Sequence, residues 1–325
     1  MKPTKFLKNM LLVCFAILAA ITITACGKQA TGMAIKPVII YSNADDEAIE
    51  VMKKTLDGTD MKDKYKIQVF GTTELGGKLL SEKTNLEADV ITLSTYYLDA
   101  AKSDLTDFKV KTSGIAETEN FQSPILGLEG GLIVNTEALK DAKLPTPTSL
   151  KDLANPIYKH TIAIPNINSS STAWLMIQAL IDTYGESEAK TIFAKILDNV
   201  GPNLEDSGSG PIKKLRTGEV AVGFGLRQQG IVDEKAGLPI KVVEVKEGNY
   251  LLTESVALLK HKTMNPNAIK VAEILANDTR KALQAYYPAA LYQGEDATAA
   301  KRFSKPLTLE LLKSHQIFAE EAKGK

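Results

Sequence analysis

The chain has 325 residues, and its 39 lysines and arginines balance 39 aspartates and glutamates, so the formal net charge is zero. A balanced charge, with no basic patch of interleaved aromatic residues, argues against a nucleic-acid-binding protein. About 300 residues follow the N-terminal segment described next, enough for two lobes of ordinary domain size.

The first 25 residues have the pattern of a secretion signal. Lysines give a basic start, and residues 10–23 form an apolar segment too short for a stable membrane span. The sequence Ile23-Thr24-Ala25-Cys26 resembles a bacterial lipobox, in which the cysteine is acylated after cleavage. We therefore expect a signal peptide over residues 1–25, a lipid anchor at Cys26 and a tether over 26–34. The protein would then be extracytoplasmic and held at the bacterial cell membrane. The alternative is an ordinary signal peptide that contains a cysteine.

The predicted cleavage also limits cysteine chemistry. Cys14 would leave with the signal and Cys26 would be blocked by lipid. The mature chain would then have no disulfide, no cysteine nucleophile and no zinc cluster.

Apolar segments and helical patterns alternate along the first third of the chain. Strands are predicted at residues 36–41, 66–70 and 88–93, and helices at 48–56 and from 75 onward. The loops that follow these strands carry small polar residues and a tyrosine, namely Ser42, Asn43, Thr72, Thr73, Ser94 and Tyr96. In open parallel α/β sheets, ligands bind at the carboxyl ends of the strands. We predict an α/β fold with a site along this edge.

The alternation continues through the rest of the chain. The predicted strands are residues 127–135, 160–165, 219–227, 240–244 and 250–259, and the predicted helices are 172–184, 189–197, 266–283 and 307–322. We interpret the first of these strands as a crossing to a second lobe, and the last two as strands that return. The final helix is amphipathic and is expected to dock as a brace.

A run of hydroxyl residues, Ser169, Ser170, Ser171 and Thr172, stands between a buried strand and a helical pattern. The first turn of a helix has unpaired N–H groups and a partly positive dipole, which suit an anion such as phosphate, phosphonate, sulfate or carboxylate. The alternative is that these residues only cap the helix, although one serine would suffice for that.

Arg227 follows a strand with a Gly-Phe-Gly sequence and is one of few arginines in a lysine-rich chain. A planar guanidinium at the site edge would bind an oxyanion through two hydrogen bonds. The alternative is a surface arginine on a loop.

Catalytic signals are scarce. None of the three histidines stands in a stretch that resembles a site, and the chain has no G-x-S-x-G elbow, P-loop, H-E-x-x-H or dinucleotide fingerprint. Tyr96-Tyr97 and Tyr286-Tyr287 are adjacent tyrosine pairs, which can hold ferric ion through phenolate oxygens, but the second pair precedes Pro288 and suits packing. We expect neither an enzyme nor a cofactor.

Three segments carry a family resemblance. Residues 38–45, 163–173 and 246–250, together with the lipobox and the two predicted lobes, resemble type 2 periplasmic binding proteins. These are the substrate-binding lipoproteins of ABC importers, and the resemblance extends to the branch that binds ferric iron, thiamine or 2-aminoethylphosphonate.

The resemblance implies two lobes joined by a hinge, with a central ligand cleft. Residues 35–132 with 250–300 would form lobe 1, residues 133–249 lobe 2, and 301–325 a C-terminal helix. Lobe 1 would offer Ser42, Asn43, Thr72, Thr73, Ser94 and Tyr96, and lobe 2 would offer Ser169, Ser170, Ser171, Thr172 and Arg227.

The expected ligand is a small anionic solute, with an organophosphonate such as 2-aminoethylphosphonate as the best match. Glu254 or Asp206 would hold its ammonium group. We expect a monomer that delivers this solute to the permease subunits of an ABC transporter. The alternatives are a ferric-iron or other small-solute binder of the same fold, and a surface adhesin or partner-binding lipoprotein.

Overall fold

The computed structural model describes residues 36–108, 120–295, 300–301 and 307–324. The predicted signal peptide, Cys26 and the tether lie outside these described residues. The chain divides into two units, Met1–Lys36 and Pro37–Lys325. All the elements below belong to the second unit.

One mixed sheet of ten strands organises the unit, in the order β2-β1-β3-β10-β5-β8-β6-β7, with β4 paired to β10 and β9 to β5. The strands are β1 (Val38–Ser42), β2 (Tyr65–Val69), β3 (Val90–Ser94), β4 (Leu105–Thr106), β5 (Gln122–Asn135), β6 (Ile162–Pro165), β7 (Leu204–Glu205), β8 (Val222–Leu226), β9 (Ile240–Val243) and β10 (Leu251–Leu259). β1 pairs in parallel with β2 and β3, and β6 in parallel with β7 and β8. β10 and β5 are antiparallel to their main-sheet neighbours.

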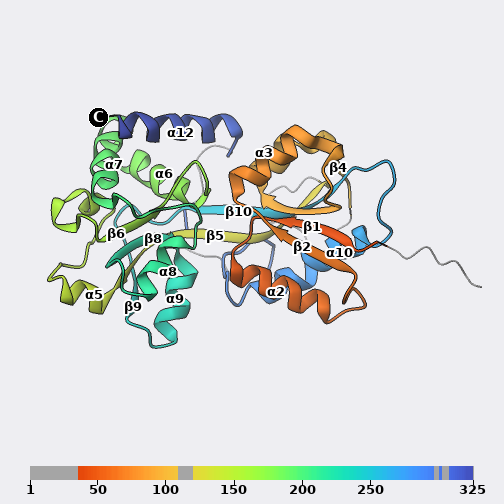
Figure 1. Ribbon diagram of the computed structural model, residues 1–325, viewed down its shortest axis with the longest axis horizontal. Coiled ribbons are helices and arrows are strands. Elements are labelled where there is room, and N and C mark those ends of the chain that lie inside the picture. The colour runs from red at the N-terminus through yellow and green to blue at the C-terminus, as the bar shows by residue number, and fades with distance from the viewer. Residues whose placement is uncertain (1–35, 109–119, 296–299, 302–306, 325) are drawn as a thin grey trace, which may run out of the picture. The chain divides into compact units, whose positions relative to one another are not determined.

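Two long strands, β5 and β10, join two groups of elements (Figure 1). One group contains β1, β2 and β4, and the other contains β6, β8 and β9. The N-terminal part of β5 pairs with β10, which in turn pairs with β3, whereas Gly130 and the residues after it pair with β8 and β9. β5 therefore belongs to both halves of the sheet. This is the crossing strand that the sequence predicts at residues 127–135.

The helices cover both faces of the sheet. They are α2 (Asp46–Asp57), α3 (Thr72–Glu82), α4 (Thr95–Ala100), α5 (Thr136–Asp141), α6 (Thr172–Tyr184), α7 (Glu186–Val200), α8 (Gly210–Arg216), α9 (Arg227–Lys235), α10 (Ala268–Ile274), α11 (Arg280–Leu283) and α12 (Leu309–Lys323). The group with β1 also contains α2, α3 and α10, and the group with β6 contains α5–α9 and α12 (Figure 1). A π-helical turn, Leu275–Thr279, joins α10 to α11, so the helix predicted over 266–283 is interrupted.

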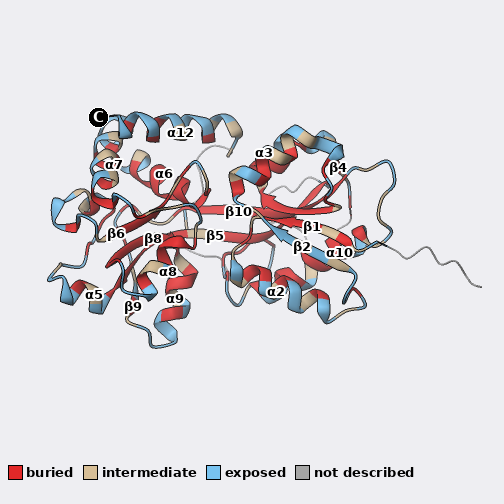
Figure 2. Cartoon of the chain, viewed as in Figure 1, coloured by how far each residue is buried: buried red, intermediate tan, exposed pale blue. Residues whose placement is uncertain are grey.

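Burial follows the sequence pattern (Figure 2). All five residues of β3 and of β8 are buried, as expected for strands covered on both faces, whereas no residue of the edge strand β2 is fully buried. The first nine residues of α6 are buried, and among them Trp174 is fully enclosed. α6 is therefore a core helix rather than a half-exposed one.

The predicted brace is confirmed for the C-terminal helix. α12 packs on α6 and α7, where the rings of Phe318 and Phe193 lie 6.0 Å apart and His315 contacts Trp174 edge-on. One boundary is wrong: the strand predicted over 219–227 ends at Leu226, and Arg227 begins α9.

Candidate functional site

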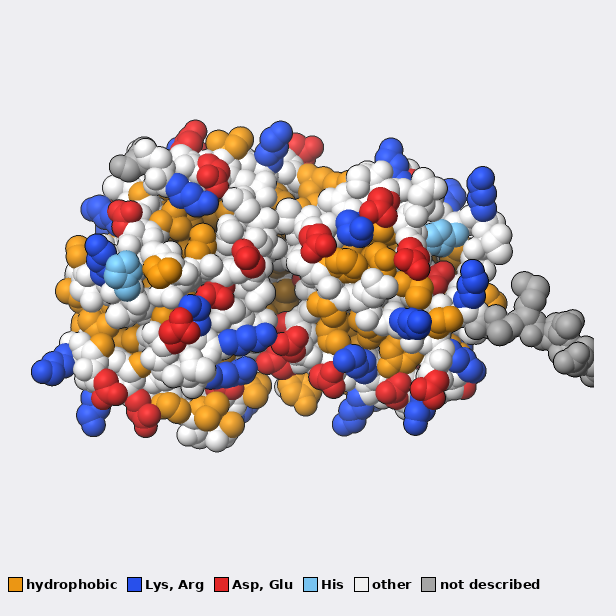
Figure 3. Space-filling view, in the orientation of Figure 1, with side chains coloured by type: hydrophobic (Ala, Val, Ile, Leu, Met, Phe, Trp, Pro, Cys, Tyr) orange, Lys and Arg blue, Asp and Glu red, His pale blue; other side chains and the backbone are white. Residues whose placement is uncertain are grey.

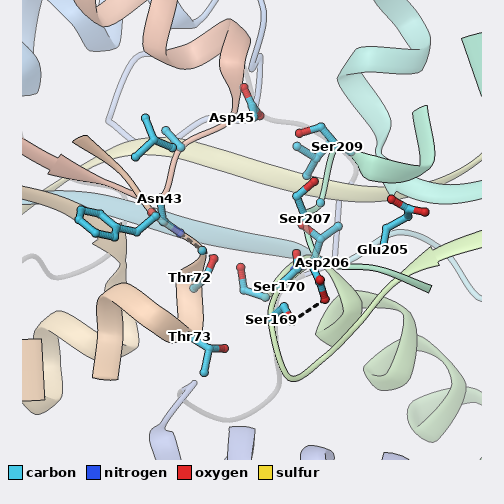
Figure 4. Close-up of a pocket in the computed structure, with 18 of the residues that line it drawn as sticks. Asn43, Asp45, Thr72, Thr73, Ser169, Ser170, Glu205, Asp206, Ser207 and Ser209 are labelled. Carbon is cyan, nitrogen blue, oxygen red and sulfur yellow. Dashed lines mark hydrogen bonds between the residues drawn. The ribbon is translucent and has the colours of Figure 1, made fainter. Parts of the chain in front are cut away.

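A cavity of about 780 Å³ lies where the loops of the two groups of elements meet. The loops after β1 and β2 and the first turn of α3 contribute one side. The loop before α6 and the loop between β7 and α8 contribute the other (Figure 4). A Cβ atom added at Gly71 would have the backbone oxygen of Ser169 as its nearest neighbour, so the two sides of the cavity approach closely. The cavity thus lies at the strand-end loops, where the sequence predicts a site.

Eight of the twelve predicted ligand-binding residues line this cavity, although they come from four separate parts of the chain. They are Asn43, Thr72, Thr73, Ser169, Ser170, Ser171, Thr172 and Glu254. Asp206, the other candidate for an ammonium group, lines it as well.

Ser42, Ser94 and Tyr96 do not line the cavity, because each is buried in the structure beneath it. Ser42 Oγ accepts hydrogen bonds from Ala44 N at 3.1 Å and from Thr92 Oγ1 at 2.6 Å, and so braces the turn after β1. Ser94 Oγ lies 3.5 Å from Glu254 Oε1, behind the lining.

Tyr96 packs in the core. Its ring lies 4.7 Å from that of Tyr97 and 5.2 Å from that of Trp174, and desolvation raises its pKa well above the usual range. A buried phenol of this kind stays protonated. In the second tyrosine pair, Tyr287 is buried and donates a hydrogen bond to Asp45, whereas Tyr286 is largely exposed.

Arg227 is also placed outside the cavity lining. Its guanidinium forms ion pairs with Glu244 and with Glu129, the latter at 3.6 Å. Because α9 begins at this residue, its side chain extends over Gly131 of β5 instead of into the cavity. The expected bidentate contact to an oxyanion has no support from this placement.

The hydroxyl run is partly occupied by local contacts. Ser169 N and Ser170 N donate to Asn166 O, Thr172 N donates to Ser170 Oγ, and Ala173 N donates to Ser170 O. Ser169 Oγ donates to Asp206 Oδ1 at 2.9 Å. Few of the N–H groups that an anion would need are left at the start of α6.

A buried network forms another part of the lining. Asn43 Nδ2 donates to Glu254 Oε1 at 2.7 Å and to Thr72 Oγ1 at 2.9 Å. Glu254 is 2% exposed and lies at an irregularity in the pairing of β10 with β5, a type of feature that re-aims side chains beside sites. Burial raises the pKa of Glu254 to about 7.

Asp45 contributes a second shifted carboxyl group. It caps α2 through Ala48 N at 3.0 Å and accepts a hydrogen bond from Tyr287 OH. Burial raises its pKa to about 6. The cap is a contact within Asp45's own segment, whereas the contact with Tyr287 joins residues far apart in the chain.

The lining is strongly acidic. It contains the carboxylates of Asp45, Asp46, Glu74, Glu205, Asp206 and Glu254 but only one basic residue, Lys213. Lys213 Nζ lies 2.9 Å from Asp46 Oδ2 and is therefore already paired. Glu205, which ends β7, and Ser207 and Ser209, which follow it, also line the cavity, although they are not singled out in the sequence analysis.

Within the described part of the chain, no group of three or more His, Cys, Asp or Glu residues is arranged to hold a metal ion. Among the same residues, no helix is both long and apolar enough to cross a membrane.

Known proteins resemble this chain in sequence and in fold. A family model described as "Bacterial extracellular solute-binding protein" matches residues 97–310. An uncharacterized protein of Haemophilus influenzae is 28% identical over 272 residues, which cover 79% of this chain and 76% of that protein. A spermidine/putrescine-binding periplasmic protein of Salmonella typhimurium is 25% identical over 208 residues, 58% of each chain.

A solved structure shares the fold. The periplasmic binding protein AfuA of Actinobacillus pleuropneumoniae, with fructose-6-phosphate bound, superposes with a TM-score of 0.68. Its sequence is 22% identical, and the match covers 89% of this chain and 97% of that one. The fold is therefore the two-lobed α/β fold of type 2 periplasmic binding proteins.

The family consists of transport proteins rather than enzymes; its members act outside the cytoplasm, where they bind a small solute for an ABC transporter. The chain belongs to the bacterial extracellular solute-binding proteins.

Proposed function

We propose that the solute captured by this protein carries at least one protonated amine. The observation that carries this proposal is the composition of the cavity lining, which has six acidic side chains and one lysine. Lys213 pairs with Asp46, and Glu205 pairs with Lys214 from outside the lining, so an acid excess remains. A cation between the two groups of elements would offset the mutual repulsion of these carboxylates, whereas an anion would add to it. The spermidine/putrescine-binding periplasmic protein of Salmonella typhimurium, which matches over 58% of each chain, is consistent with such a ligand.

A second candidate is a zwitterion such as 2-aminoethylphosphonate, whose anionic head would meet hydroxyl groups while its amine meets carboxylates. The hydroxyls of Thr73, Ser207 and Ser209 line the cavity. The first turn of α3 lines it too, and its N-cap Gly71 supplies no side-chain cap. The uncapped N–H groups of that turn suit the oxygens of a phosphonate. The acid excess of the cavity lining makes a purely anionic solute the weaker candidate.

A panel of solutes tests the proposal by thermal unfolding of the purified protein. Putrescine, spermidine, 2-aminoethylphosphonate, inorganic phosphate, fructose-6-phosphate and ferric citrate would each be added in excess. A ligand present at about 100 times its Kd adds about 2.7 kcal/mol of stability, which shifts Tm by several degrees. A shift with amines supports the proposal, and a shift with phosphate or ferric ion alone would contradict it.

We further propose the lobe boundaries and the anchor that the sequence predicts. Lobe 1 would comprise residues 35–132 and 250–300, and lobe 2 residues 133–249, because the pairing partner of β5 changes after Glu129. Ligand-dependent protection from proteolysis at the crossing segments would test the hinge. Mass spectrometry of the N-terminal peptide from the native host would show whether Cys26 is acylated.

A further inference from the structure

Asn43 and Glu254 each keep one buried oxygen without a partner at the cavity wall. These atoms are Asn43 Oδ1 and Glu254 Oε2, and both residues line the cavity. Leaving a buried acceptor unpaired is unfavourable, so such atoms in a native structure call for an explanation. A bound ligand that donates hydrogen bonds to these two oxygens would provide that explanation.

The amide of Asn43 can present only acceptors to a ligand. Its Nδ2 group has two N–H donors, and these are given to Glu254 Oε1 at 2.7 Å and to Thr72 Oγ1 at 2.9 Å. An ionised carboxylate only accepts hydrogen bonds, so turning the amide over would set oxygen against oxygen. Ionised Glu254 therefore fixes the orientation of the amide, and Oδ1 has no partner.

Four of the other five carboxylates of the lining already have a partner, and the fifth, Glu74, is exposed. Asp45 accepts from Tyr287 OH and Ala48 N, Asp46 pairs with Lys213, Glu205 pairs with Lys214, and Asp206 accepts from Ser169 Oγ. Glu254 receives hydrogen bonds on Oε1 alone, from Asn43 and, at 3.5 Å, from Ser94 Oγ. Its Oε2 is the acceptor that remains for a ligand when Glu254 is ionised.

We propose that Asn43 and Glu254 select a primary ammonium group and reject a quaternary one, an inference that rests on the proposed binding of an amine. A primary ammonium is compact and has three N–H donors and no acceptor, which complements the two unpartnered acceptors. A trimethylated nitrogen keeps the charge but has no N–H, so both oxygens would stay unpaired. An oxyanion would face two further oxygens and be repelled.

The test compares each amine with its N-trimethylated form by isothermal titration calorimetry of the wild-type protein. Putrescine and 2-aminoethylphosphonate are the two primary-amine probes. We expect Kd to be at least tenfold higher for the trimethylated form of whichever probe binds, because the carboxylate attraction is retained while the hydrogen bonds are lost. Equal affinity for the two forms would overturn the selection by Asn43 and Glu254 and leave the proposed cation site standing. Absence of binding by every cationic probe would overturn both.

Variants then assign the effect to one oxygen. Glu254→Gln replaces a carboxylate oxygen by an N–H donor of the same size, and we expect the ratio between the primary and trimethylated probes to fall toward one. Glu74→Gln removes the same charge from an exposed residue of the lining. This variant should raise Kd for both probes by a similar small factor and so preserve the ratio of the two Kd values. A preserved ratio in Glu254→Gln, with the same Tm as wild type, would contradict the assignment.

Discussion

Lys213 Nζ lies 2.9 Å from Asp46 Oδ2, and this ion pair connects α8 of one group of elements to α2 of the other across the cavity. Two neighbouring contacts join the same helices and α9: Arg216 lies 3.6 Å from Glu47, and Gln229 donates to Glu47 at 2.8 Å. On the face shown in Figure 3, acidic and basic side chains stand on both sides of the hollow between the groups. The start of α2 is thus held by three side chains from the opposite group.

Reversing one charge of this pair should weaken the contact between the two groups of elements. Lys213→Glu would set two carboxylates against each other, but the side chains of Lys213 and Asp46 are 58% and 77% exposed, so screening limits the effect to about 1 kcal/mol. We expect the free energy of unfolding to fall by about that amount at low salt and by less at high salt. The double variant Asp46→Lys/Lys213→Glu should recover most of the loss. Urea unfolding at two salt concentrations measures this, and a double variant no more stable than the single one would show that the pair does not couple the groups.

Glu254 should make the protein less stable as pH rises. Burial raises its pKa from 4.5 to about 7, so between these values the folded protein holds a proton that the unfolded chain has lost. The free energy of unfolding then falls with increasing pH, by about 2–3 kcal/mol between pH 5 and pH 8 from this group. Glu254→Gln cannot titrate and should flatten this part of the profile. Urea unfolding of both proteins at the two pH values tests it, and parallel profiles would contradict the assignment to Glu254.

The same carboxyl group should make amine binding depend on pH in the opposite direction. An ammonium ligand needs the ionised form, which becomes the minor form below a pKa of about 7. Binding of a primary amine should therefore be roughly tenfold weaker at pH 6 than at pH 8. Asp45, whose pKa is raised to about 6, adds to the loss at lower pH. Calorimetry across this range would show the trend, and Glu254→Gln should bind weakly with little change over the same range.

Replacing Arg227 should lower the free energy of unfolding without changing the affinity for the ligand. Its side chain is 23% exposed and lies between two carboxylates, of which Glu129 is 15% exposed. Arg227→Ala would leave Glu129 without its cation, at a cost of about 1–3 kcal/mol in the free energy of unfolding. Because Arg227 does not line the cavity, Kd for the ligand should change by less than about threefold, within the range of indirect effects. A rise in Kd of tenfold or more would instead indicate that Arg227 contacts the ligand.

The sequence predicts well those features that depend on local pattern. Apolar runs bounded by polar loops locate β1, β3, β6 and β8, and because the carboxyl ends of such strands converge, the loops with Asn43, Thr72 and Ser170 share one cavity. The orientation of a side chain is harder to predict from the sequence. The position of Arg227 depends on whether it ends a strand or begins a helix, and its partner Glu244 lies 17 residues further on.

The charge of the cavity could not be read from the sequence for a similar reason. The sequence marks Asp206 and Glu254 as candidates for an ammonium group, but Asp45, Glu74 and Glu205 come from other parts of the chain and are not marked as part of the same site. The hydroxyl run attracts notice because it is contiguous, yet its N–H groups are largely satisfied by neighbours such as Asn166. A contiguous motif is therefore easier to recognise in a sequence than a dispersed acidic set that only the fold assembles.

The pairing of β10 with β3 has a consequence for biosynthesis. Leu93 of β3 is covered by Ser255 of β10, so β3 has an open edge until more than 150 residues of later chain have been made. Unpaired strand edges recruit other chains, and long sequence separation slows closure. Fragments that end before Leu251 should therefore aggregate, and the nascent protein depends on being kept from premature association until its tenth strand is available.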